Sequence, residues 1–176
     1  MKKLKVGVIG LNNIVRLHMP GWHLSPYTEV VAAADIDEDI LQKWGQNNNI
    51  DNLYSNPLDL ISNPEIDIID ICTPNNFHCE LAIKSLEAGK HVLCEKPLAP
   101  TAEEIKKMIE ARDKSSKKLI LLNYPGPESK INLKKINNSL FELSDAYFFS
   151  KDKFTKIESI EILNNSNNFK KINWKL

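Results

Sequence analysis

Short apolar segments alternate with longer amphipathic segments from residue 4 to about residue 122, and this alternation constrains the fold more than any other feature. A repeated strand–helix order is typical of βαβ units, which build a parallel sheet with helices on both faces. The sequence therefore predicts an α/β, doubly wound fold. The expected strands are Leu4–Ile9, Val30–Ala34, a short one near Leu53–Tyr54, Ile66–Cys72, His91–Cys94 and Leu119–Leu122.

The segments between these strands carry start and stop signals for helices. Asp37 is a candidate N-cap, and the stretch from Thr101 to Glu104 has a capping-box pattern. Pro20 and Gly21 are expected to kink or shorten the first helix. The expected helices are 13–24 with Ile14, Leu17 and Trp22 facing inward, one after Asp37 with Ile40, Leu41 and Trp44, a small one after Pro57, 76–88 and 101–112.

Composition excludes several classes of partner and site. Lys and Arg number 23 and Asp and Glu also number 23, so nothing favours nucleic acid or an anionic membrane as a partner. No apolar run reaches the roughly 18 residues of a membrane span. The three cysteines, Cys72, Cys79 and Cys94, include no CxxC, which indicates a reducing cytoplasm without a disulfide framework or a metal site. We interpret Cys72 and Cys94 as buried apolar residues, and the histidines at 18, 23 and 91 as structural or surface residues.

The pattern changes after residue 123. The last part of the chain holds five of the six Phe residues and loses the clean alternation. We expect residues 1–123 to form one domain and residues 124–176 a divergent α+β tail. The tail is expected to contain a helix over 127–136 and strands over 146–149 and 157–163, and its Asn-rich end is expected to fray.

The first strand ends in a turn that reads Gly10-Leu-Asn12-Asn13-Ile14-Val15. In an open parallel sheet, ligands bind at the carboxyl ends of the strands, and a Rossmann-type first turn holds a dinucleotide pyrophosphate through the pattern G-x-G-x-x-G/A. Gly10 provides the tight turn, but Asn12 and Val15 replace the second and third residues of the pattern. Asn tolerates left-handed backbone better than most residues, so the turn can survive, with Asn12 either crowding the phosphates or donating to them.

The second strand ends in Asp35, where a dinucleotide-binding fold places the carboxylate that accepts the hydroxyls of the adenosine ribose. A carboxylate there repels a 2′-phosphate, and no Arg follows in Ile36-Asp37. The expected cofactor is therefore NAD, with NADP less favoured. The alternative is that Asp35 or Asp37 only caps the next helix, and for Asp37 we prefer this alternative.

Three further stretches are more specific: AAADID at 32–37, CTPNNFH at 72–78 and CEKPLA at 94–99. Together with the first turn they resemble the N-terminal domain of the Gfo/Idh/MocA (glucose–fructose oxidoreductase and inositol dehydrogenase) family. The resemblance extends from Lys5 to about Asn123. It implies a Rossmann-type domain that binds a nicotinamide dinucleotide, and hydride transfer between that cofactor and a sugar or cyclitol hydroxyl carbon.

The resemblance also assigns roles by position. Lys96 would be the catalytic residue, contacting the nicotinamide ribose and the substrate hydroxyl and assisting proton transfer, and Pro97 would follow a cis peptide bond. The alternatives are that Lys96 is only a solvated charge and that His78 is only a polar residue at a helix start. The expected cofactor-binding residues are Gly10, Asn12, Asn13, Ile14, Asp35, Thr73, Pro74, Asn76, His78, Glu95, Lys96 and Pro97.

Members of this family continue into a second domain that provides the substrate pocket and an Asp/His motif, and residues 127–149 resemble its beginning only faintly. The chain is then expected to be a truncated, split or frame-shifted product, or a single-domain descendant. Three hypotheses remain open. The chain is the cofactor-binding half of a polyol or sugar oxidoreductase, as a homo-oligomer or with a complementing subunit; or it is a non-catalytic nucleotide-binding module; or it is a fold without a ligand.

Overall fold

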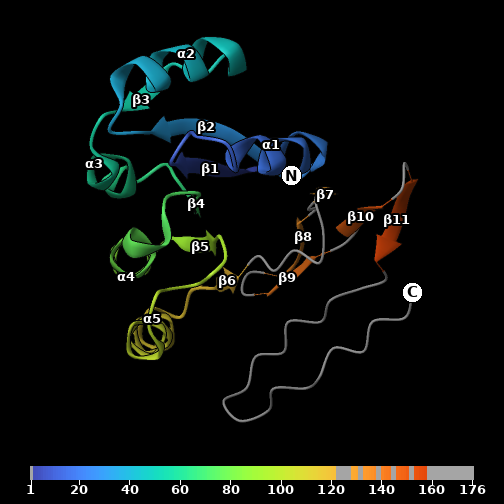
Figure 1. Cartoon of the computed structure of the whole chain (residues 1–176). Coiled ribbons are helices and arrows are strands. Elements are labelled where there is room, and N and C mark those ends of the chain that lie inside the picture. The colour runs from blue at the N-terminus through green and yellow to red at the C-terminus, as the bar shows by residue number, and fades with distance from the viewer. Residues whose placement is uncertain are drawn as a thin grey trace.

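The computed structural model describes residues 2–121, 128–130, 133–137, 140–143, 146–150 and 153–157. The helices are α1 (Val15–Leu24), α2 (Glu38–Asn48), α3 (Pro57–Ser62), the single 3₁₀ turn η1 (Asn75–Phe77), α4 (His78–Glu87) and α5 (Ala102–Ser115). The strands of the large sheet are β1 (Leu4–Ile9), β2 (Thr28–Ala34), β3 (Asn52–Tyr54), β4 (Ile68–Ile71), β5 (His91–Cys94) and β6 (Leu119–Leu121). Strands and helices alternate along the chain as the sequence predicts (Figure 1).

The six strands form one parallel sheet in the order β3-β2-β1-β4-β5-β6. The chain builds outward from β1 to β3, returns to the centre, and then builds in the other direction from β4 to β6. The strand order therefore reverses between β1 and β4, which is the point where open α/β sheets bind their ligands. This architecture confirms the predicted doubly wound, Rossmann-type sheet.

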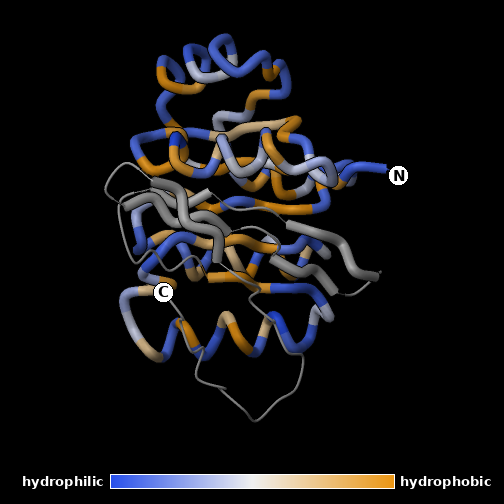
Figure 2. Tube along the Cα trace, turned by 90° about the vertical axis from the view of Figure 1, so that its right-hand side faces the viewer, coloured by the Kyte–Doolittle hydropathy of each residue, from blue (hydrophilic) through white to orange (hydrophobic). Residues whose placement is uncertain are grey.

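Two apolar clusters cover the two faces of the sheet. Val6 and Val8 of β1 belong to a buried cluster with residues of α1 and α2, whereas the next side chain, Ile9, belongs to a cluster with residues of α3, α4 and α5. This alternation follows from the two-residue period of a strand, which sends successive side chains to opposite faces. In Figure 2 the central strands are largely orange, because a sheet covered on both faces needs apolar residues at nearly every position.

The predicted helix caps are confirmed. The Thr101 hydroxyl accepts from the Glu104 amide at 3.2 Å, and the Glu104 carboxylate accepts from the Thr101 amide at 3.1 Å, which completes a capping box. Asp37 accepts from the Ile40 amide at 3.0 Å and caps α2. The last helix continues to Ser115, three residues beyond its predicted end.

The first helix differs from the prediction in its inward face. Its buried residues are Val15, His18, Met19, Gly21 and Trp22, whereas Leu17 is only half-buried. Residues 15, 18, 19 and 22 follow the helical period, and Leu17 lies off that stripe. The helix runs through Pro20 and Gly21 to Leu24 and is not shortened.

The predicted helix over 127–136 is wrong for the described residues of that segment. These residues form β7 (Glu128–Lys130) and β8 (Leu133–Asn137). β8 pairs with β9 (Leu140–Leu143), and β7 pairs with β10 (Ala146–Ser150), which itself pairs with β11 (Lys153–Ile157). Periodicity does not separate helix from strand in short apolar runs, and pairing with distant residues decides the outcome. β10 confirms the strand predicted at 146–149, and most of the strand predicted at 157–163 lies outside the described residues.

Candidate functional site

The predicted site residues gather at the carboxyl ends of four strands of the parallel sheet. Gly10 follows β1, Asp35 follows β2, Thr73 comes two residues after β4, and Glu95 follows β5. Because the strands are parallel, these ends lie along one edge of the sheet. The side chains of Asn12, Asn13, Pro74, Asn76, Lys96 and Pro97 are exposed there, and those of Asp35, His78 and Glu95 are buried.

Gly10 brings the first turn directly against the end of β4. Its φ is +88°, and a Cβ atom built at Gly10 would lie 2.8 Å from the backbone nitrogen of Thr73 and 2.9 Å from the carbonyl carbon of Cys72. Both the backbone conformation and the lack of space therefore require glycine. The two loops on either side of the point where the strand order reverses are in contact through this residue.

The departures from the glycine pattern are accommodated without disrupting the turn. Asn12 does not adopt left-handed backbone. The non-glycine residues of the described chain that have a positive φ are Asn49 and Ser116. Val15 is the first residue of α1 and is 2% exposed, so its side chain belongs to the core instead of facing the turn. Among the described residues, no side chain caps the N-terminus of α1, which begins at the expected pyrophosphate position.

Asp35 links the first turn to the end of β2. Its carboxylate accepts from the backbone amide of Leu11 at 2.7 Å and from that of Asp37 at 3.0 Å. Asp37, not Asp35, caps the following helix, which decides between the alternatives that the sequence left open. A carboxylate has about four acceptor positions, so Asp35 retains capacity for further donors such as ribose hydroxyls.

Thr73 carries the one buried polar side-chain atom that has no hydrogen-bond partner within the described part of the chain, its hydroxyl Oγ1. A buried hydroxyl without a partner is unfavourable by about 1–3 kcal/mol, so it is suited to form a hydrogen bond with a polar ligand. The residues that follow, from Pro74 to Phe77, are exposed. This loop therefore fits a polar ligand that lies beside Thr73 at the centre of the sheet edge.

His78 lies below this loop, and its two ring nitrogens already have partners. It is 1% exposed, with Nε2 2.8 Å from the carbonyl oxygen of Thr73 and Nδ1 2.9 Å from that of Pro97. Carbonyl oxygens only accept, and the tautomer decides which ring nitrogen carries a proton and donates. His78 thus fastens the loop after β4 to the bend after β5, and a direct hydrogen bond to a ligand would have to replace one of these bonds.

Glu95, Lys96 and Pro97 form the bend that ends β5. The peptide bond between Lys96 and Pro97 is cis, as the resemblance implies. Glu95 is 3% exposed, and its Oε2 accepts from the backbone amide of Lys96 at 2.9 Å. The Lys96 side chain is exposed at the same edge as Thr73 and the first turn.

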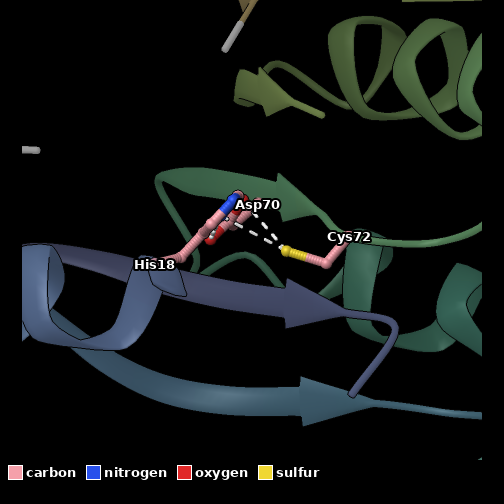
Figure 3. A group of neighbouring side chains, drawn as sticks. All are labelled: His18, Asp70 and Cys72. Atoms are coloured by element: carbon pink, nitrogen blue, oxygen red, sulfur yellow. Dashed lines mark hydrogen bonds and ion pairs between the residues drawn. The ribbon is translucent and has the colours of Figure 1, made fainter. Parts of the chain in front are cut away.

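A buried polar cluster that the sequence reading did not identify lies beneath this edge. Asp70 of β4 and His18 of α1 face each other, with His18 Nδ1 2.9 Å from both carboxylate oxygens (Figure 3). The Cys72 sulfur lies 3.3 Å from the same nitrogen, and the Trp22 indole donates to Asp70 at 2.7 Å. On the other side of the ring, His18 Nε2 lies 3.0 Å from Oε1 of Glu95.

Both ring nitrogens of His18 face carboxylate oxygens, and this arrangement favours a protonated imidazole. Burial alone would lower the pKa of His18, but the charge of Asp70 and the contact with Cys72 raise it far above its ordinary value. Burial, together with Asp70, also raises the pKa of the Cys72 thiol to about 12. The possible metal ligands His18, Asp70 and Cys72 lie within 4.8 Å of one another, but each is already hydrogen-bonded within the group. Cys72 is therefore a member of a polar network and not only an apolar residue.

Comparison with known proteins agrees with this geometry. A family model described as an oxidoreductase family with an NAD-binding Rossmann fold matches residues 4–123. Levoglucosan dehydrogenase of Pseudarthrobacter phenanthrenivorans is 36% identical over 137 residues, which cover 70% of this chain and 34% of that protein. Myo-inositol 2-dehydrogenase of Thermotoga maritima is 33% identical over 112 residues, which cover 64% of this chain and 34% of that protein.

Solved structures give the same result. Levoglucosan dehydrogenase in complex with NADH and levoglucosan matches 68% of this chain and 34% of its own length, with a TM-score of 0.65 and 30% identity. The chain thus spans about a third of the length of the relatives that it matches. Within the described part of the chain, no helix has the length and apolar character needed to cross a membrane.

Proposed function

The chain belongs to the Gfo/Idh/MocA family of oxidoreductases with an NAD-binding Rossmann fold, and we propose that it supplies the cofactor-binding half of an NAD-dependent sugar or cyclitol dehydrogenase. The observation that carries this proposal is the Asp35 carboxylate, which is held against the first turn by the Leu11 amide at 2.7 Å. A carboxylate fixed at the end of β2 is suited to bind the two hydroxyls of the adenosine ribose.

The same carboxylate favours NAD over NADP. The 2′-phosphate of NADP would bring a second negative charge to a group that is 8% exposed. The residues after Asp35 are Ile36 and Asp37, so no arginine stands where a 2′-phosphate would need one. We therefore expect a clear preference for NAD(H).

Along the rest of the edge, we propose that the pyrophosphate lies at the first turn and at the N-terminus of α1, which no side chain of the described residues caps. The unpartnered Thr73 hydroxyl supports the fit of a polar ligand at the centre of the edge. The same ligand would also be bordered by the other cofactor-binding residues that the sequence predicts, which are Asn12, Asn13, Ile14, Pro74, Asn76, Glu95 and Pro97.

Lys96 is the proposed catalytic residue. When bound, the nicotinamide supplies the hydride acceptor. Lys96 would hydrogen-bond the substrate hydroxyl, orient its carbon and assist removal of the hydroxyl proton, a role that suits a flexible lysine at a strand end. The bend after β5, fixed by Glu95 and His78, carries this lysine toward the cofactor edge.

The substrate and partners are also proposals. Sugar and cyclitol substrates are proposed because the relatives include levoglucosan dehydrogenase and myo-inositol 2-dehydrogenase. We propose that the substrate pocket comes from a further domain, a complementing subunit or a second copy of the chain. Three buried free cysteines support a reducing compartment such as the cytoplasm.

The test is the thermal stability of the purified chain with NAD, NADH, NADP and NADPH in turn. A ligand at about 100 times its Kd stabilises a fold by roughly 2.7 kcal/mol, which gives a readable shift. Stabilisation by NAD(H) and not by NADP(H) is the expected result. A cooperatively folded sample that responds to none of the four would contradict the proposal and favour a domain without a dinucleotide ligand.

A further inference from the structure

We propose that His18 is a positioning residue for Lys96, acting through the buried carboxylate of Glu95. The proposal rests on the function proposed for Lys96 and adds a second residue, from a different element, that determines where Lys96 lies. His18 is 2% exposed, and both of its ring nitrogens already face carboxylates. Its effect would pass through two hydrogen bonds, first to Glu95 and then to the Lys96 backbone.

The two oxygens of Glu95 have separate partners. Oε1 lies 3.0 Å from His18 Nε2, and Oε2 accepts from the Lys96 amide at 2.9 Å. With both oxygens occupied, the Glu95 side chain has one orientation, and it holds the backbone at the start of the bend. Hydrogen bonds between ionised partners are about twice as strong as neutral ones, so the contact with a protonated imidazole gives this link its stiffness.

Asp70 completes the arrangement from the neighbouring strand. Its carboxylate faces Nδ1 of His18 and also accepts a hydrogen bond from the Trp22 indole. The imidazole ring therefore lies between the Asp70 carboxylate on β4 and the Glu95 carboxylate just after β5. Burying two carboxylates is unfavourable without a cation between them, and the His18 ring supplies that cation. Removing the ring would therefore free Glu95 to turn away from the Lys96 amide.

The connection also runs back to the first turn. His18 lies on α1 three residues after Val15, where the helix begins beside the expected pyrophosphate position. One helix turn thus separates the proposed phosphate site from the group that holds the Lys96 bend.

A matched pair of substitutions separates the two halves of the network. The side-chain amide introduced by His18→Gln can reach about as far as Nε2 and keep a donor for Glu95, whereas the shorter amide introduced by His18→Asn can replace only Nδ1 and its contact with Asp70. For each full-length variant, the affinities for NADH and for ADP would be measured by calorimetry. ADP retains the adenosine ribose and both phosphates of the pyrophosphate but lacks the nicotinamide ribose that Lys96 is proposed to contact.

We expect Lys96→Ala to weaken NADH binding by about tenfold, or 1.4 kcal/mol, and to leave ADP binding unchanged. His18→Asn should reproduce most of this selective loss, and His18→Gln should show much less of it. In the Lys96→Ala background, His18→Asn should add no further selective loss, because the two residues act through one path. Lys90→Met serves as the stability control, since the buried Lys90 ammonium donates to the carbonyls of Asn63 and Ile66 at 2.7 and 2.8 Å, at the opposite end of β5.

Several outcomes would overturn the inference. Equal losses of NADH and ADP affinity in His18→Asn would mean that the residue acts only on stability. A selective effect of Lys96→Ala without one of His18→Asn would refute the positioning role alone, whereas no selective effect of Lys96→Ala would refute the function proposed for Lys96 and the inference with it. As a measurement that needs no variant, ¹⁵N spectra of the wild-type chain at neutral pH should show protons on both ring nitrogens of His18. A neutral ring would contradict the role of His18 as the cation between two carboxylates.

Discussion

The backbone amide of Leu11 donates a 2.7 Å hydrogen bond to Oδ2 of Asp35, and this bond joins the first turn to the end of the second strand. Asp35 is buried, and its other oxygen accepts from Asp37. A change at Asp35 therefore affects both the shape of the turn and the charge that a ribose would meet. These two effects are separable by experiment.

Asp35→Asn removes the charge and retains an oxygen for the Leu11 amide. Because hydrogen bonds to charged groups contribute about 1.5–3 kcal/mol, we expect NAD affinity to fall by roughly tenfold to a hundredfold. NADP affinity should fall less, since the repulsion of its 2′-phosphate is relieved. Calorimetric titration with both dinucleotides measures the ratio.

The matched control for Asp35→Asn is Asp37→Ala, two residues further along. It removes the cap of α2 and should lower the free energy of unfolding by about 1 kcal/mol. The ratio of NAD to NADP affinity should stay the same in this variant. If the ratio of NAD to NADP affinity changes in Asp37→Ala, or stays at the wild-type value in Asp35→Asn, then Asp35 does not select the cofactor.

Gly10→Ala tests the contact between the first turn and the end of β4. The added Cβ would lie 2.8 Å from the Thr73 nitrogen, on a residue with φ of +88°. Left-handed backbone alone is unfavourable by about 1–2 kcal/mol for a non-glycine residue, and displacement of the loop adds to this. We expect lower stability in chemical denaturation and loss of NADH binding even under conditions where the variant is folded. Retained binding by a folded variant would contradict the close approach of the two loops.

The fold could be predicted from the sequence because its signals are local. Capping residues such as Asp37 and Thr101 mark helix starts, and short apolar runs separated by helices leave few arrangements other than a parallel sheet. Gly10 and Asp35 were found for the same reason, since a parallel sheet collects the carboxyl ends of its strands, whereas Thr73, His78 and Lys96 were assigned through the family resemblance. The cis bond before Pro97 came from family resemblance, not from a physical signal in the chain.

The buried network was missed because its partners are far apart in the sequence. His18 is separated from Asp70 by 52 positions and from Glu95 by 77. One signal was present: Asp70 is a charged residue in the middle of a strand whose neighbours are apolar, and such a residue requires a buried partner. The choice of partner required the three-dimensional arrangement. The strands β7 and β8 were missed for a similar reason, because their pairing and not their own pattern decides their structure.

Thr73→Val should separate stability from ligand binding. The valine side chain has nearly the same shape as threonine but no hydroxyl, and the Thr73 hydroxyl is buried without a partner in the described chain. Removing an unsatisfied group of this kind should leave the free energy of unfolding unchanged or raise it by about 1 kcal/mol. NADH binding should weaken by roughly fivefold to tenfold if the hydroxyl contacts the cofactor. Thr73→Ser, which keeps the hydroxyl, should bind as the wild type does, and equal binding by Thr73→Val would remove Thr73 from the site.

Alkaline pH should destabilise the chain through Cys72. Burial, with the nearby Asp70, raises the pKa of this thiol from 9.0 to about 12 in the folded chain, so between these values the unfolded chain loses a proton that the folded chain keeps. The folded state then binds more protons, and the free energy of unfolding falls as pH rises, by about 1.4 kcal/mol per pH unit for one thiol. The contribution of Cys72 is fully present below pH 9 and is lost progressively toward pH 12.

Cys72→Ala lacks this titration and isolates it from the other groups that ionise at alkaline pH. The stability advantage of the wild type over Cys72→Ala, measured by urea denaturation at each pH, should shrink from pH 9 upward. Below that pH the difference should be constant with respect to this thiol. A difference that stays constant across the whole range would mean that the thiol ionises equally in both states. Cys72 would then have no special environment beside His18 and Asp70, and the hydrogen-bonded cluster of Figure 3 would need to be revised.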